Sequence, residues 1–128
     1  MGGQTRFPLL HASAVARDLM ELLEASCERL AIAGSIRRKK PDVGDIELLA
    51  IPRLGQATDL WGKGLNPLEG VALLDHRVIQ LIKMGVLAYR LNVKGKKTFG
   101  PLNKLLVHIP SGIPVDLFSA TAQNWGMA

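Results

Sequence analysis

The hydrophobic residues of the chain repeat with a helical period in two segments and form short strand-like runs elsewhere. From about Leu9 to Leu30, apolar residues recur every three or four positions, with acidic residues mostly on the other face, so one long amphipathic helix is expected. A second helix is expected over residues 71–84, where Gly85 provides a good C-terminal stop. Apolar runs bounded by turn residues predict strands over residues 31–33, 43–51, 86–93, 98–109 and 113–119.

Turn residues and one long irregular stretch separate these elements. Residues 35–39 are expected to form a helical turn that Pro41 stops, and residues 94–97 and 111–112 are expected to form tight turns. Residues 53–70 contain four Gly and one Pro without periodicity, so we expect a loop there. The order of the elements predicts an α/β (α+β) domain, in which a mixed, largely antiparallel sheet packs on two main helices.

Composition describes a globular chain with a basic balance. The 128 residues are 48% hydrophobic, enough for one core, so we expect a flexible segment over residues 1–8 and a single domain over residues 9–128. The net charge of +5 favours an acidic partner such as a nucleic acid. No run is long and apolar enough to span a membrane. The single Cys27 falls in the helical pattern as a core residue, so we expect neither a disulfide nor a disulfide-linked partner and place the protein in the cytoplasm.

Two carboxylates, Asp45 and Glu47, stand two residues apart in the apolar run 43–51. Residues i and i+2 of a strand face the same side, so the two acids repel each other and are costly to bury unpaired. A divalent cation relieves both costs. Mg²⁺ prefers oxygen ligands and shares its coordination shell with substrate phosphates. The pair therefore predicts a site for Mg²⁺ or Mn²⁺.

A Gly-Ser turn with two arginines precedes these acids. Gly34 lets the backbone approach a ligand closely, and Ser35 is a good N-cap that leaves free N–H groups at a helix start. Arg37 and Arg38 fall in the first helical turn, where the helix dipole disfavours cations, so an anionic partner is indicated. A triphosphate and its metal ions would both be served by this one stretch.

The sequence reads Gly-Ser-Ile-Arg-Arg at residues 34–38 and Gly-Asp-Ile-Glu at residues 44–47. These segments resemble the nucleotidyltransferase superfamily and, within it, most closely the family X (polymerase β-like) DNA polymerases. Those enzymes have Gly-Ser-aromatic-Arg-Arg and then Gly-Asp-apolar-Asp. Ile36 departs from this pattern at the aromatic residue and Glu47 at the second Asp, where some antibiotic-modifying members of the superfamily also have Glu.

The resemblance continues toward the C-terminus. In the family, a Gly-containing turn and a Lys-rich strand precede the strand with the third carboxylate, and residues 94–100 and 114–117 are similar to these elements. This implies that Asp116, which interrupts an apolar strand, joins Asp45 and Glu47 in holding two Mg²⁺ or Mn²⁺ ions. Rival third ligands in the sequence are Asp59, Glu69 and Asp75.

The resemblance also implies where substrates bind. Gly34, Ser35 and Arg38 would bind the nucleotide, with Ser35 and Arg38 on its β- and γ-phosphates, whereas Arg37 is either solvated or in contact with the template. A set of lysines either grips the DNA backbone or forms a solvated face. Its members are Lys94, Lys96, Lys97 and Lys104.

These features predict a metal-dependent nucleotidyltransferase palm, a reduced family X DNA polymerase. It would add a nucleotide from a triphosphate to a 3′-hydroxyl of DNA and release pyrophosphate. Two alternatives stay open: an enzyme that nucleotidylates a small molecule or a protein, and a non-catalytic nucleotide-binding palm. The likeness covers about residues 30–120. The family's lyase domain, helix-hairpin-helix clamp and thumb have no counterpart, so we expect either a minimal member or a chain cut before its thumb.

Overall fold

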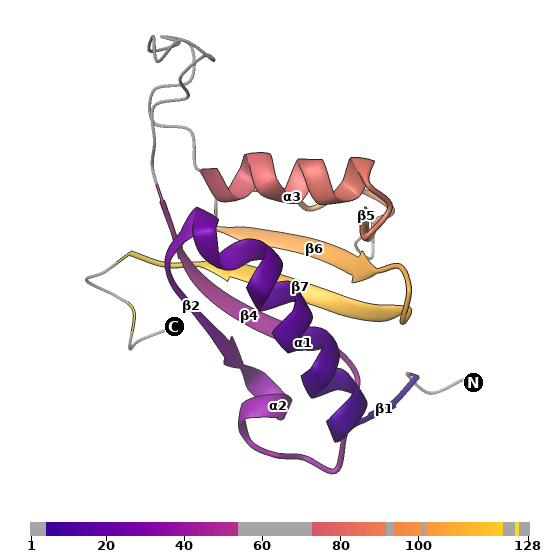
Figure 1. Ribbon diagram of the computed structural model, residues 1–128. Coiled ribbons are helices and arrows are strands. Elements are labelled where there is room, and N and C mark those ends of the chain that lie inside the picture. Colours follow the sequence, from indigo (N-terminus) through magenta and orange to yellow (C-terminus); the bar gives the residue numbers. More distant parts are fainter. Residues whose placement is uncertain (1–4, 54–72, 92–93, 101, 122–124, 126–128) are drawn as a thin grey trace, which may run out of the picture.

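A five-stranded sheet with strand order β2-β4-β7-β6-β5 forms the centre of the computed structural model (Figure 1). The structure describes residues 5–53, 73–91, 94–100, 102–121 and 125. Two longer helices, α1 (Leu9–Leu23) and α3 (Leu73–Lys83), pack on one face of this sheet (Figure 1). The strands are β2 (Cys27–Ala33), β4 (Ile46–Pro52), β5 (Leu87–Tyr89), β6 (Asn103–His108) and β7 (Ile113–Ser119).

The sheet is mixed, as the sequence predicted. The pairs β2–β4, β5–β6 and β6–β7 are antiparallel, and only the central pair β4–β7 among these five strands is parallel. Because β7 lies between β4 and β6, the last of the described strands in sequence order joins the two halves of the sheet. The expected α/β (α+β) class, with a largely antiparallel sheet on two main helices, is therefore confirmed.

Alternation along the central strands decides which side chains enter the core. Ile46 and Leu48 of β4 and Val115 and Leu117 of β7 are buried against the two helices. Successive residues of a strand point to opposite faces, so the intervening residues, among them Glu47, lie on the face that α1 and α3 leave uncovered. Apolar burial thus fixes the side on which the charged residues of these strands stand.

The first helix is shorter than its sequence pattern predicted. α1 ends at Leu23, a short 3₁₀ helix (η1) covers Glu24–Ser26, and β2 begins at Cys27. The prediction of a helix to Leu30 is wrong because pairing of β2 with β4 outweighs the local periodicity, as tertiary context often does. Cys27 is buried as expected, but in a strand.

The segment before the acids is divided differently from the prediction. A short strand β3 (Asp42–Val43) pairs with β1 (Phe7–Pro8), so the last two residues of the expected flexible segment belong to a strand pair instead. Arg6 forms an ion pair with Asp42 at 2.7 Å, which ties the two segments together. The expected single strand over residues 43–51 is therefore broken after β3 and resumes as β4.

The second half of the chain follows the prediction more closely. α3 begins at Leu73, next to residues outside the described part, and β7 has the predicted bounds. Among the described residues, the expected strands over residues 86–93 and 98–109 appear as β5 and β6, with isolated bridges at Leu91–Lys97 and Phe99–Lys104. Residues 92–93 and 101 of these predictions lie outside the described part. Most of the predicted loop 53–70 lies outside the described residues. Among the described helices, none is long and apolar enough to cross a membrane.

Candidate metal and nucleotide site

Three carboxylates converge on the uncovered face of the sheet. Glu47 of β4 is the register partner of Asp116 of β7, and Asp45 lies just before β4. Parallel register partners share a face, so the two strands bring the acids together although they are far apart in sequence. One oxygen from each carboxylate lies within 4.8 Å of the others. The three residues predicted as metal ligands therefore form one cluster.

The cluster is unfavourable for charged carboxylates without a counter-ion. Burial raises the pKa of Asp45, and the charge of Asp116 raises it further, while Arg90 acts in the opposite direction. Burial also raises the pKa of Glu47, with further contributions from the neighbouring acids, and Arg38 opposes them. The three carboxylates offer hard oxygen ligands, a chemistry that suits Mg²⁺ or Mn²⁺.

Arg90 is a member of this site that the sequence analysis did not identify. Its guanidinium forms an ion pair with Asp116 and also donates a hydrogen bond to the carbonyl of Leu106 at 3.1 Å. Arg90 follows β5, which pairs with β6, and β6 pairs with β7. Had the register of these two pairs been known, the alternation of side chains would have placed Arg90 on the same face as Asp116. Chain position alone gave no such signal.

The Gly-Ser turn lies directly beside Glu47. α2 (Gly34–Arg37) begins at Gly34, which has a positive φ of 66°. A Cβ at this position would lie 2.4 Å from Oε2 of Glu47, so only glycine fits without moving the carboxylate. The predicted N-cap role of Ser35 is wrong, because Ala33 occupies the cap and Ser35 lies inside the helix. Its hydroxyl instead accepts a hydrogen bond from Arg38 at 3.4 Å.

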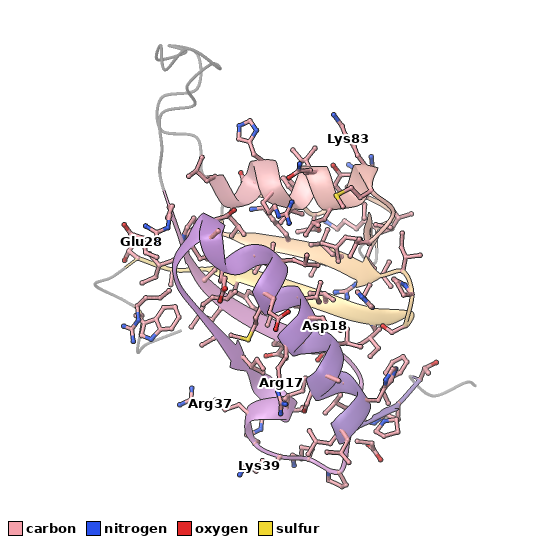
Figure 2. All side chains as sticks on the ribbon, in the orientation of Figure 1. Arg17, Asp18, Glu28, Arg37, Lys39 and Lys83 are labelled. Carbon is pink, nitrogen blue, oxygen red and sulfur yellow. The ribbon has the colours of Figure 1, made fainter. Side chains whose placement is uncertain are left out.

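A cleft of about 670 Å³ joins the turn to the sheet. Its lining includes Gly34, Arg38 and Glu47 together with the apolar Leu49 and Phe118. Arg37 also borders this cleft and is exposed, projecting outward from α2 (Figure 2). The cleft thus places two arginines, a carboxylate and an apolar wall around one space.

The four candidate DNA-binding lysines divide into two groups. Lys94, Lys96 and Lys97 are exposed on the segment after β5, with Lys97 over the ring of Tyr89 at 4.3 Å. Lys104 is only 1% exposed, because its side chain enters the helix-covered side of the sheet. Its predicted contact with a DNA backbone is therefore wrong in this structure.

Lys104 instead holds an ion pair in the interior. Its ammonium lies 2.8 Å from a carboxylate oxygen of Asp75 on α3 and donates to the carbonyl of Gly100 at 2.9 Å. Asp75, one rival third ligand, is thus already paired away from the cluster. The other two rivals, Asp59 and Glu69, lie outside the described residues.

Two other potentially reactive side chains, Cys27 and His108, have contacts that indicate structural roles. Burial raises the pKa of Cys27 to about 11, so its thiol stays protonated at neutral pH and supplies neither a nucleophile nor a thiolate ligand. His108 contacts the hydroxyl of Ser111 at 2.7 Å, and that hydroxyl also accepts from the backbone of Ile113. The pair stabilises the turn between β6 and β7.

Comparison with known proteins supports the fold. No protein-family model matches the sequence, and no curated protein matches it. Among solved structures, the chain is similar to Leishmania infantum polymerase beta in a ternary gap complex, with a TM-score of 0.55 and 22% identity. The match covers 91% of this chain and 39% of that chain. The protein thus has a polymerase β-like fold and spans well under half of that polymerase.

Proposed function

We propose that the chain is a metal-dependent nucleotidyltransferase palm that adds a nucleotide to a 3′-hydroxyl of DNA. The single observation that carries this proposal is the cluster of Asp45, Glu47 and Asp116, with one oxygen from each within 4.8 Å of the others. In the reaction, the hydroxyl oxygen forms a bond to the α-phosphorus, and the bond from that phosphorus to the β-phosphate bridge breaks. Pyrophosphate leaves, and the hydroxyl proton passes to solvent.

The cluster fits two Mg²⁺ or Mn²⁺ ions because all three ligands are carboxylates, the hard oxygen ligands that these ions prefer. Asp45 and Glu47 would hold the ion that accompanies the triphosphate, and Asp116 would hold the other. Bound metal supplies activation of the hydroxyl and neutralisation of developing charge. The residues of the chain fix where the acceptor and the triphosphate meet.

The Gly-Ser turn would receive the triphosphate. Gly34 leaves room for close approach, while Ser35 and Arg38, which already contact each other, would bind the β- and γ-phosphates. The arginine supplies a charge-assisted, forked contact that a lysine cannot reproduce. Support for this placement comes from the cleft that Gly34, Arg38 and Glu47 line together.

DNA is the proposed acceptor on two grounds. One structural neighbour is a polymerase beta in a gap complex, and three exposed lysines, Lys94, Lys96 and Lys97, follow the edge strand β5. Clustered exposed lysines bind phosphates without sequence preference. Lys104 has no part in this surface because it is buried.

A small molecule or a protein is the second candidate acceptor. The observation that favours it is Glu47, whose longer side chain replaces the family's Asp and lies against the Gly34 turn. A third hypothesis, nucleotide binding without turnover, requires no acceptor at all. The three hypotheses share one site and differ in the acceptor, which is DNA in the first, a small molecule or a protein in the second, and absent in the third.

Transfer from a radioactively labelled triphosphate separates these functions. Primed DNA, small hydroxyl compounds and the protein itself serve as acceptors, with Mg²⁺ or Mn²⁺ present. We expect label in extended primer, and its loss in Asp45→Asn. Label in a small acceptor or in protein, and not in primer, would overturn DNA as the acceptor and support the second candidate. Nucleotide binding without transfer to any acceptor would overturn the enzyme and leave a binding palm.

A further inference from the structure

We propose that Arg90 is a positioning residue for Asp116: it holds this carboxylate in the metal-free protein and is exchanged for a divalent cation when one binds. The inference rests on the proposed function, because it concerns the same carboxylate cluster. It adds a residue that no part of the sequence analysis assigned. It also assigns that residue an effect on metal affinity of predictable sign.

Backbone pairing places Arg90 on the uncovered face of the sheet. The N–H of Arg90 donates to the carbonyl of Leu105 at 3.1 Å, which continues the β5–β6 pairing by one residue. Leu105 is in turn the register partner of Asp116. Residues in one row across a sheet share a face, so the Arg90 side chain reaches over Leu105 toward the carboxylate.

Two contacts hold the guanidinium in this position. One nitrogen donates to the carbonyl of Leu106 at 3.1 Å, and another pairs with Asp116. The side chains of Arg90 and Asp116 are 29% and 16% exposed, so solvent screens the pair less than it screens a surface ion pair. A guanidinium that is held by the carbonyl of Leu106 can orient the carboxylate of Asp116, which a freely moving surface arginine cannot do.

Charge balance explains why this contact should yield to a cation. The cluster offers three carboxylates and Arg90 offers one positive charge, which acts on Asp45 as well as on Asp116. A divalent cation on the same carboxylates would meet the guanidinium as a like charge. The protein therefore keeps the cluster ordered without metal, at the expense of weaker intrinsic binding of the metal alone.

A purely structural role for Arg90 makes a different prediction. If Arg90 only joined β5 to β7, its removal would lower stability and leave metal affinity unchanged, or weaken it through disorder of Asp116. Under the proposal, a neutral replacement lowers the stability of the metal-free protein but makes it bind metal more tightly. The opposite directions of these two effects distinguish the roles.

The test is calorimetric titration of Mn²⁺ alone, without nucleotide, into wild type and Arg90→Gln. We expect about tenfold tighter binding by Arg90→Gln, because a competing positive charge is removed. Arg90→Lys, which keeps the charge, should bind nearly as wild type does. The matched control is Arg17→Gln, which removes an exposed arginine from α1 on the other side of the sheet and should change nothing (Figure 2).

Stability supplies a second readout and a safeguard against misfolding. Metal-free Arg90→Gln should melt below wild type, and Mn²⁺ should raise its melting temperature more than that of wild type, because tighter binding to the folded state stabilises it more. If the Gln variant does not fold, Arg90→Met replaces it, because its unbranched stem can still pack over Leu105 without charge. Unchanged or weaker Mn²⁺ affinity in a folded neutral variant overturns the role of Arg90.

One further variant separates this failure from failure of the proposed function. Asp116→Asn should weaken Mn²⁺ binding, and the addition of Arg90→Gln to this variant should then raise the affinity by less than it does on the wild-type background, because only the effect of Arg90 on Asp45 is left. Loss of binding in Asp116→Asn with no effect of Arg90→Gln on the wild-type background overturns Arg90 alone. No Mn²⁺ binding by wild type, or binding indifferent to Asp116, overturns the metal site and the role of Arg90 together.

Discussion

A basic residue is paired with a carboxylate on each face of the sheet, and the two pairs have different surroundings. On the helix-covered face, Lys104 meets Asp75 and a backbone carbonyl. On the uncovered face, Arg90 meets Asp116, which has two further acids beside it. The first pair balances its charges, whereas the second leaves an excess of negative charge. Under the proposed function, the interior pair serves stability, whereas in the open pair Asp116 is a cation ligand that Arg90 holds until a cation replaces it.

The largest expected effect is on the open face. Asp116→Asn should keep the fold, leave triphosphate binding nearly intact and slow transfer by a factor of about a thousand or more, because one metal ligand is lost. Asp45→Asn should weaken triphosphate binding as well. Single-turnover transfer and nucleotide affinity, measured side by side, test this. Asp75→Asn is the control from the other face, and equal losses of rate in Asp116→Asn and Asp75→Asn would break the comparison.

The next effect belongs to the interior pair. Lys104→Ala should lower the free energy of unfolding by about 2–4 kcal/mol, because it leaves a cavity and a partly buried unpaired carboxylate. Arg90→Gln should cost less, about 1 kcal/mol, because the Arg90 side chain is 29% exposed, whereas the Lys104 side chain is 1% exposed. Urea unfolding of both metal-free variants gives these values. A larger loss for Arg90→Gln would contradict the assignment of stability to the interior pair.

Arg38 tests whether the open face also binds the triphosphate. If Arg38 pairs with a phosphate, Arg38→Ala should weaken binding of the metal–triphosphate complex by about 1.5–3 kcal/mol. Arg38→Lys should recover only part of this, because it restores the charge and not the fork. Calorimetry with a non-hydrolysable nucleotide measures both. Wild-type affinity in the Ala variant would remove Arg38 from the site.

The lysines extend the comparison to DNA. Joint replacement of Lys94, Lys96 and Lys97 by Ala should flatten the log–log dependence of DNA affinity on salt by up to about three units, nearly one for each lost phosphate contact. The control is Lys104→Gln, which also removes a positive charge, but from a buried lysine, and should leave that slope as it is. Fluorescence anisotropy over a salt series provides the slopes. A wild-type slope in the triple variant would assign these lysines to the solvated surface.

The smallest effect is a dependence of stability on pH. The folded-state pKa values of Asp45 and Glu47 are raised, so the folded protein binds protons more readily than the unfolded chain. The resulting destabilisation is present above these raised values and is relieved as the pH falls through them. We expect a gain of about 1 kcal/mol or less between neutral and mildly acidic pH, since both groups are partly exposed.

Denaturant unfolding in EDTA at several pH values measures this gain in the free energy of unfolding, and Asp45→Asn serves as the reference. The variant should be slightly more stable than wild type at neutral pH and should show a smaller gain on acidification. A wild-type protein that loses stability over this range while Asp45→Asn loses none would contradict the sign of the effect.

Local sequence was sufficient where the signal itself is local. The motifs at residues 34–38 and 44–47, together with the family resemblance that favoured Asp116 over its rivals, predicted the carboxylate cluster before any strand pairing was known. β7 had its predicted bounds because a Gly turn precedes it and its apolar alternation is regular. The ends of such elements can be predicted from the residues within and next to them.

Where tertiary pairing decides, the sequence was insufficient. Cys27 fits a helical period and a strand equally well, so only pairing of β2 with β4 could end the helix at Leu23. Lys104 follows a run of surface lysines but is buried, and its partner Asp75 lies on a helix far away in sequence. Arg90 required the register of two strand pairs before it could be related to Asp116. Each of these facts is non-local.

The central position of β7 has a consequence for the order in which the protein is assembled. β7 separates β4 from β6, so residues up to β6 can form only two half-sheets. Closing the parallel β4–β7 pair spans a long loop, and such non-local pairing is slow because chain entropy is lost first. On the ribosome, the carboxylate cluster therefore appears only after β7 has been synthesised. A nascent or misassembled chain cannot capture metal ions with the complete cluster.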